Sequence, residues 1–257
     1  MSEHTLLGRT EKELLWFQRR SFLQAAAAWT TMGGFTAAVA PQRSNIVELR
    51  GDAQLNGARL RPEQTVQTGD QIETGPDSHL VFVMGNAAFQ VRQNSRFVVE
   101  RGATLSAVSV LRMLTGAIVS VWSKGNARQI VTPTLTAGIR GTGVYTEVFP
   151  DRGYRSYFCN CYGVVDMDAG GDRTVSTSQY HQSFWGEAQP VNGKLLTPAK
   201  AINHTDEEVE MVARLIGQRT AWQIAGRKGV KDGAGYMDPQ PGQVHPLMQQ
   251  QQPAPQR

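Results

Sequence analysis

The chain has 257 residues and a formal net charge of +4, which is a weak imbalance for this length. Nucleic-acid binding requires a concentrated basic surface, and outside the first forty residues the longest basic run is Arg227-Lys228. We therefore predict no nucleic-acid partner. The two cysteines, Cys159 and Cys161, are too few for a disulfide-stapled scaffold, so we expect hydrophobic packing to supply the core.

The first forty residues have the features of an export signal. Arg19 and Arg20 are followed by Ser-Phe-Leu and then by a weakly apolar stretch over 25–40, whereas a membrane span needs about 20 strongly apolar residues. This pattern resembles a twin-arginine signal, which lies outside the fold. Residues 38–40 (Ala-Val-Ala) offer a cleavage site, although Pro41 disfavours cleavage. We predict a periplasmic protein, tethered to the inner membrane if the signal stays uncleaved.

From residue 45 to about 168 the sequence reads as short strands separated by turns, without helical periodicity. The strand 46–49 ends at Arg50-Gly51-Asp52, and a hairpin surrounds Gly85-Asn86. Strands spaced by about 8–12 residues, with Gly, Pro, Asn and Asp between them, are typical of an all-β sandwich or roll. We predict one β domain over residues 45–170.

The segment 132–148, TPTLTAGIRGTGVYTEV, is a glycine-rich turn that leads into an alternating strand. A phosphate-binding Gly-x-Gly-x-x-Gly loop opens a helix, but β-branched and aromatic residues follow here and favour a strand. Arg140 stands between Gly138 and Gly141. We expect it to satisfy loop carbonyls or to pair with a carboxylate, with ligand binding as the alternative.

Three separated elements occur in the order typical of one known family. They are residues 68–77 (TGDQIETGPD), residues 116–121 (GAIVSV) and the turn with Arg140, Gly141 and Thr142. Together they resemble the FecR-like domain over about residues 65–165. The resemblance implies a periplasmic, all-β domain involved in sensing and regulation, and it names no ligand.

A different pattern begins after residue 170. Thr205 with Glu208 three positions later forms a capping box, which predicts an amphipathic helix over 206–217 within a C-terminal extension, 171–232. We expect this helix to dock on the β domain. Residues 233–257 are rich in Pro and Gln and are predicted to form a disordered tail.

The cysteine pair is the segment with the clearest chemistry. On a strand, Cys159 and Cys161 share one face, and three interpretations stay open: a strained disulfide, two inert buried thiols or a metal site. His181 and His204 are the candidate partners, because His4 lies in the signal, His79 in an early turn and His245 in the tail. Two sulfurs with two imidazoles suit zinc or copper.

Other candidate sites are weaker. Asp166 and Asp168 share one face at a strand end, which indicates a solvated turn or, alternatively, a divalent-cation site. The sequence lacks Gly-x-Ser-x-Gly, His-Glu-x-x-His and Ser-x-x-Lys, and we assign no catalytic residue.

The function predicted from sequence is a non-catalytic binding or regulatory module of the cell envelope, whose partner is an envelope protein or a polysaccharide. Two alternatives remain. One is a metal-binding periplasmic protein that uses Cys159, Cys161, His181 and His204. The other is a carbohydrate-binding envelope protein.

Overall fold

A computed structural model describes residues 5–6, 9–10, 44–101, 108–125 and 127–229. The chain divides into two compact units, residues 1–42 and 43–257. In the first unit, β1 (Thr5–Leu6) pairs antiparallel with β2 (Arg9–Thr10). The predicted twin-arginine pair, the cleavage site and the tail from residue 233 lie outside the described residues. Among the helices described, none is long and apolar enough to span a membrane.

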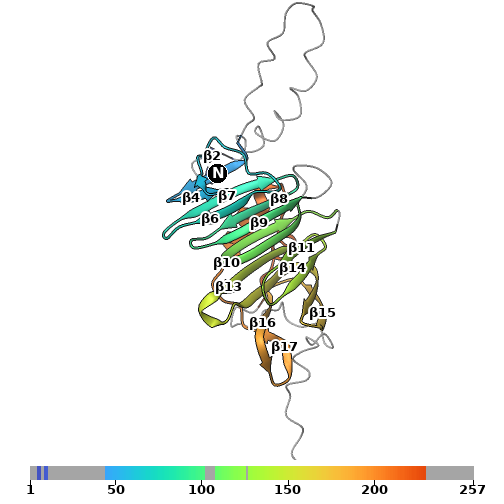
Figure 1. Cartoon of the computed structure of the whole chain (residues 1–257). Helices are drawn as coiled ribbons and strands as arrows, with labels where there is room; N and C mark the ends of the chain where they lie inside the picture. Colours follow the sequence, from blue (N-terminus) through green and yellow to red (C-terminus); the bar gives the residue numbers. More distant parts are fainter. Residues whose placement is uncertain (1–4, 7–8, 11–43, 102–107, 126, 230–257) are drawn as a thin grey trace, which may run out of the picture. The chain divides into compact units, whose positions relative to one another are not determined.

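The second unit contains two β-sheets that share two long strands, β10 (Val108–Trp122) and β14 (Arg155–Ala169) (Figure 1). We call the first the covered sheet; its order is β3 (Ile46–Arg50), β7 (His79–Met84), β8 (Ala87–Val91), β10, β13 (Gly143–Phe149), β14, β16 (Gln182–Val191), β17 (Lys194–Ala199). We call the second the open sheet; its order is β5 (Ala58–Arg59), β4 (Ala53–Leu55), β6 (Gln71–Thr74), β9 (Arg96–Arg101), β10, β11 (Arg128–Val131), β12 (Thr136–Ile139), β14, β15 (Asp172–Ser178).

The two shared strands change sheets at glycines. In β10 the pairing moves from β9 to β13 and β8 around Gly116, whose φ is +80°. In β14 it moves from β13 to β15 around Gly163, whose φ is +102°. A Cβ atom on Gly116 would lie 2.3 Å from the Cα of Ser95. Glycine is required at such bends because it tolerates positive φ and a close backbone neighbour.

Strands β10, β11, β12, β14 and β13 each pair with the next, and β13 pairs again with β10, so these five strands close a ring. The interior between the sheets is apolar, and its largest side chains are Phe82, Phe89, Phe97, Trp122, Phe158 and Phe184. The predicted all-β sandwich is confirmed. Its core is hydrophobic packing, as expected for a chain with so few cysteines.

The strands extend beyond the predicted β domain. Residue 170 falls in the turn between β14 and β15, and β15, β16 and β17 continue the sheets through Ala199. The sequence of β15, DRTVSTS, is too polar to be recognised as a strand. It pairs nonetheless because the open sheet has one solvated face, so an edge strand needs few apolar residues.

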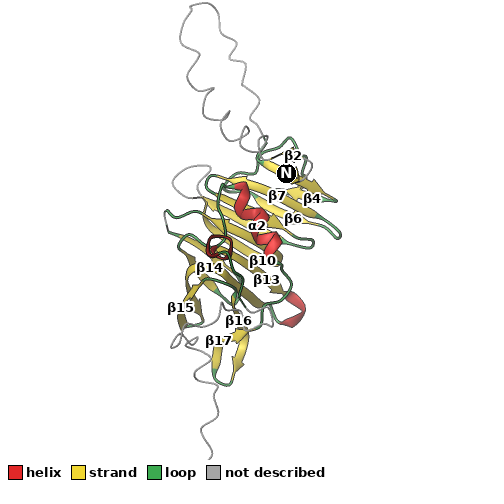
Figure 2. Ribbon diagram, turned by 180° about the vertical axis from the view of Figure 1, so that it is seen from behind, coloured by secondary structure: helices red, strands yellow, loops and turns green. Residues whose placement is uncertain are grey.

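Two helices follow the last strand. Helix α2 (Asp206–Leu215) begins at the predicted capping box of Thr205 and Glu208 and ends two residues earlier than predicted. Helix α3 (Ala221–Ala225) has a second capping box, and a 3₁₀ turn, η1 (Pro150–Arg152), follows β13. Figure 2 shows α2 lying across the covered sheet. Its buried residues Val209, Val212 and Ala213 pack against outward side chains of that sheet, which include Val81, Ala88 and Val119.

Candidate metal centre

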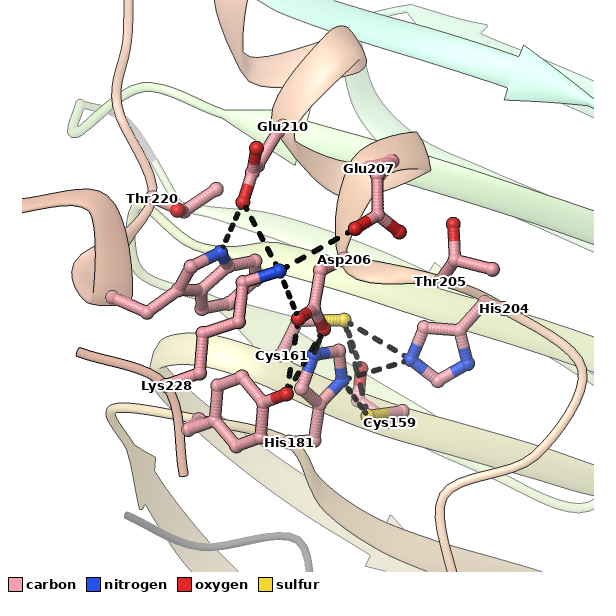
Figure 3. A network of polar contacts seen from close by, with 12 residues as sticks. Cys159, Cys161, His181, His204, Thr205, Asp206, Glu207, Glu210, Thr220 and Lys228 are labelled. Atoms are coloured by element: carbon pink, nitrogen blue, oxygen red, sulfur yellow. Dashed lines mark hydrogen bonds and ion pairs between the residues drawn. The ribbon is translucent and has the colours of Figure 1, made fainter. Parts of the chain in front are cut away.

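The four predicted ligands meet at one point beneath the helices (Figure 3). Cys159 and Cys161 lie on β14, His181 lies in the turn between β15 and β16, and His204 lies between β17 and α2. Their ligand atoms are all within 4.8 Å of one another. Both cysteines have no exposed surface, His181 is buried and His204 is half-buried.

The alternation of β14 orients the sulfurs. Phe158 belongs to the apolar interior, whereas Tyr157, Cys159 and Cys161 belong to the cluster beneath the helices. Successive side chains of a strand point to opposite faces, so both thiols face the helices. The turn places His181 beside them, since its backbone N–H donates to the carbonyl of Cys161 at 2.9 Å.

Three distances between the ligand atoms are close to those around a tetrahedral ion, whereas the two nitrogens, 3.0 Å apart, are closer than in such a site. Zinc bonds of about 2.3 Å to sulfur and about 2.0–2.1 Å to nitrogen place tetrahedral ligand atoms about 3.8 Å (S–S), about 3.6 Å (S–N) and about 3.3 Å (N–N) apart. The Sγ atoms of Cys159 and Cys161 are 3.8 Å apart. Cys159 Sγ lies 3.5 Å from His181 Nδ1, and Cys161 Sγ lies 3.6 Å from His204 Nε2.

Hydrogen bonds on the far side of each imidazole determine which nitrogen faces the cluster. His181 Nε2 donates to the carboxylate of Asp206 at 3.0 Å. His204 Nδ1 donates to the carbonyl of Ile202 at 2.7 Å. Both partners only accept, so in the neutral rings the protons sit on these outer nitrogens. Metal-bound histidines are held in this way by carboxylates or backbone carbonyls.

In the neutral rings, the two inner nitrogens consequently face one another as acceptors. His181 Nδ1 and His204 Nε2 are 3.0 Å apart, and in the neutral tautomers each presents only a lone pair there. A thiol proton of Cys159 or Cys161, whose sulfurs lie 3.5 and 3.6 Å from these nitrogens, or a bound cation can satisfy each lone pair. The cluster has the donor atoms and the spacing to hold a metal ion in place of these protons.

The groups of the cluster shift one another's pKa values. Burial alone would raise the pKa of Cys159, but the Cys161 thiol and both histidines lower it below its ordinary value. Burial and the neighbouring Cys159 raise the pKa of Cys161. Burial opposes a charged His181, yet Cys159 and Asp206 raise the pKa of His181 to about 9.

An outer layer of side chains holds Asp206 in place. Burial would raise the pKa of Asp206, but hydrogen bonds from His181 and Lys228 lower it. Lys228 Nζ lies 2.7 Å from Asp206 Oδ2, and the Tyr180 hydroxyl donates to the same carboxylate at 3.0 Å. The ring of Trp222 stacks on His181 with centroids 5.2 Å apart. Sequence reasoning missed this layer, because Asp206 resembles an ordinary first-turn acid, Tyr180 beside His181 resembles a core aromatic residue, and Trp222 and Lys228 are distant from the ligands in sequence.

A catalytic triad and the disulfide considered from the sequence do not agree with the geometry, whereas both cysteines are buried free thiols. Cys159, His181 and Asp206 follow the order of nucleophile, base and orienting acid, but Cys159 has no exposed surface for a substrate to approach. A disulfide requires a bond of about 2.05 Å, whereas both cysteines are free thiols. The arrangement instead provides four soft or borderline ligands around one point.

The glycine-rich turn has a different role. Arg140 is exposed and pairs with Asp166, with Nη2 and Oδ2 2.6 Å apart. Pairing with a carboxylate was the expected arrangement, although the guanidinium is in solvent and not buried. Thr142 is buried, and its hydroxyl donates to Asn160 Oδ1 at 3.1 Å on β14. Gly141 has φ +75°. The turn thus joins β12 and β13 to β14.

The remaining candidates lie elsewhere. Asp168, the partner of Asp166 in the predicted carboxylate pair, accepts from Arg173 Nε at 2.5 Å. Each of these carboxylates therefore has its own arginine. His79 lies on β7, outside the cluster, while His4 and His245 lie outside the described residues.

The fold and the site together define an all-β sandwich with a buried Cys₂His₂ cluster under two short helices. Comparisons with protein-family models, with curated proteins and with solved structures found no match to this chain. Function must therefore be argued from the geometry of the cluster.

Proposed function

We propose that the protein is a non-catalytic zinc-binding module of the cell envelope. Zinc would be held by Cys159, Cys161, His181 and His204. The observation that carries this proposal is the pair of facing imidazole nitrogens, 3.0 Å apart, beside two sulfurs 3.8 Å apart. Four such atoms around one buried point form a donor set for a metal ion, and the separation of the sulfurs matches that in a tetrahedral site.

The donor set favours zinc over other metals. Calcium and magnesium prefer oxygen ligands, and copper(II) prefers a square-planar arrangement. Tetrahedral sites with two sulfurs and two nitrogens are typical of zinc. An iron–sulfur cluster of the Rieske type binds its cysteines and histidines to different irons, which would separate them further than the 4.8 Å limit of this group. Copper(I) is the alternative that the experiment below distinguishes.

A structural role fits the ligand count. Catalytic zinc sites keep one position open for water or substrate, whereas structural sites are filled by four protein ligands. Here four protein atoms converge, three of them on fully or almost fully buried residues. We infer that the metal stabilises the fold and that the β-sandwich acts by binding a partner.

The proposed location rests on the sequence. The resemblances to a twin-arginine signal and to FecR-like domains support an envelope protein with a sensing or regulatory role. Transport in a folded state would let thiolates acquire their metal in the reducing cytoplasm, before they meet the oxidising periplasm. A Cys₂His₂ centre is thus compatible with the proposed route.

Elemental analysis tests the proposal. The full chain is purified without a metal-affinity tag, and its metal content is measured beside a free-thiol count under denaturing conditions. We expect about one equivalent of zinc in the native protein and none in the Cys159→Ser/Cys161→Ser variant, whose melting temperature falls. His79→Ala, a histidine outside the cluster, is the matched control and should retain its zinc.

The other outcomes separate the alternatives. One equivalent of copper would keep the site and change its metal. Zinc retained in the double cysteine variant, or no metal in the native protein even after incubation with zinc under reducing conditions, would refute the proposal.

A further inference from the structure

The four proposed ligands are divided unequally between two parts of the fold. Cys159, Cys161 and His181 belong to the sheets and their turns, whereas His204 follows the last strand. We call residues 200–229, which contain α2 and α3, the C-terminal arm. Resting on the zinc site proposed above, we propose that metal occupancy regulates how firmly the C-terminal arm is docked on the covered sheet.

Both helices of the C-terminal arm, and the segment after them, contact the centre. Asp206 in the first turn of α2 accepts from His181 Nε2 at 3.0 Å. Trp222 in α3 stacks on the ring of His181 and donates to Glu210 at 2.6 Å. Lys228 reaches Asp206 at 2.7 Å (Figure 3). A change at the metal therefore reaches the whole C-terminal arm through direct contacts.

Other contacts hold the C-terminal arm without any metal. Arg92 Nη2 donates to both carboxylate oxygens of Glu208, at 2.7 and 2.8 Å. The Tyr157 hydroxyl donates to the carbonyl of Lys200 and accepts from the N–H of Ile202, both at 3.0 Å. The apolar face of α2 is buried on the sheet. Metal binding consequently adjusts the local opening of the C-terminal arm and does not create its fold.

His204 supplies the coupling, because it is the one proposed ligand on the C-terminal arm. Zinc would join its Nε2 atom to Cys159, Cys161 and His181 of the sheet region, whereas without zinc this atom keeps only its contacts to His181 Nδ1 at 3.0 Å and Cys161 Sγ at 3.6 Å. His181 is fixed by Asp206 and by its backbone bond to Cys161. His204 is half-buried and follows Asn203, whose φ is +59°. Without the metal its ring is still stacked on Tyr145 of β13, with centroids 4.6 Å apart, so we expect loss of metal to loosen the linker that begins α2 without releasing it.

Hydrogen exchange of the full chain measures this coupling. Some amides exchange only when His204 has dissociated from the metal. Zinc should slow their exchange by the factor by which the fourth ligand increases the affinity for zinc. We expect zinc to slow exchange in residues 200–229 by about 10- to 100-fold. Peptides from β6 and β9 in the open sheet serve as the internal reference and should not change.

The His204→Ala variant provides the decisive comparison, because it leaves the three ligands of the sheet region in place. Its zinc content is measured in the same sample. We expect it to bind zinc more weakly, and at saturating zinc its C-terminal arm should exchange at the same rate as without zinc. His79→Ala should keep the full effect of zinc.

Two outcomes would overturn the inference while leaving the zinc site intact. One is native protein that binds zinc yet shows unchanged exchange in residues 200–229. The other is a zinc-loaded His204→Ala variant that keeps the full protection. Failure of native protein to bind zinc at all would instead refute the proposed function, and the inference with it.

Discussion

The outer faces of the two sheets differ although the same two long strands build both. On the open sheet, arginines and carboxylates of neighbouring strands pair in solvent: Arg96 with Glu73, Arg112 with Glu100, Arg140 with Asp166 and Arg173 with Asp168. On the covered sheet, apolar and aromatic outward residues pack in one cluster with α2 and α3. Charge in solvent is neutralised pair by pair, while polar groups under the helices must be satisfied within the protein.

Strand β14 contains both situations within 15 residues. Its first half presents Cys159 and Cys161 to the covered face, and its second half presents Asp166 and Asp168 to the open face. The carboxylates have arginine partners, so they do not need a cation from outside. The outer nitrogens of the two imidazoles have their own acceptors, whereas the inner nitrogens and the sulfurs contact one another around a point that suits a cation. Burial, more than residue type, makes the cysteine and histidine site suited to a cation and the carboxylate pair not.

The largest expected effect is the loss of Trp222 from the covered face. Trp222 is 2% exposed and contacts the rings of His181, Tyr162 and Tyr180. Trp222→Ala should lower the free energy of unfolding by about 3–5 kcal/mol because it leaves a large cavity. Urea denaturation measures the change.

Ile224 on the same helix is 70% exposed and provides the matched control. Ile224→Ala should change the free energy of unfolding by less than about 0.5 kcal/mol. Equal effects of the two substitutions would show that α3 is not packed on the sheet as described.

A smaller effect is expected when the orienting carboxylate is neutralised. Asp206→Asn keeps the size of the side chain but removes the charge that accepts from His181 and Lys228. We expect the zinc dissociation constant to rise by about 10- to 100-fold, as measured by competition with a chelator. Glu207→Gln, whose carboxylate is 70% exposed, should leave the affinity unchanged; equal losses in both variants would contradict a specific role for Asp206.

Two arginines test the contrast between the faces directly. Arg92 is part-buried, pairs with Glu208 of α2 and lies over the ring of Tyr145. Arg92→Ala should cost about 1.5–3 kcal/mol of unfolding free energy. Arg140 is 66% exposed, and Arg140→Ala should cost less than about 1 kcal/mol. Thermal or urea unfolding of both variants measures the two costs. A greater cost for Arg140→Ala than for Arg92→Ala would contradict the contrast between the two faces.

The smallest effect concerns pH. Burial, partly offset by Glu48, lowers the pKa of His79 from its ordinary value of 6.5. The unfolded chain therefore binds the proton more readily, and stability falls as the pH drops through the ordinary value. His79→Gln should remove this loss, so the variant gains stability relative to the native protein at pH 5 but not at pH 8. Urea denaturation at the two pH values checks this, and a difference independent of pH would contradict it.

Much of the fold was predictable because its signals are local. Turn residues at short intervals predicted the strands of the sandwich, and the capping box of Thr205 and Glu208 predicted α2. Strands β15 to β17 were not predicted, because their polar residues are stabilised by pairing with neighbours distant in sequence. The resemblance to FecR-like domains and the export signal remain predictions.

For the site, the sequence by itself determined the chemical types available. Alternation along a strand placed Cys159 and Cys161 on one face, and elimination of the other histidines selected His181 and His204. Only the tertiary structure decided that these atoms meet. It also decided that Asp206 and the carbonyl of Ile202 accept hydrogen bonds from the outer nitrogens, and that the inner nitrogens lie 3.0 Å apart. The reason is physical: strand alternation is a local property, whereas convergence depends on the docking of the C-terminal arm across a sheet assembled from the whole domain.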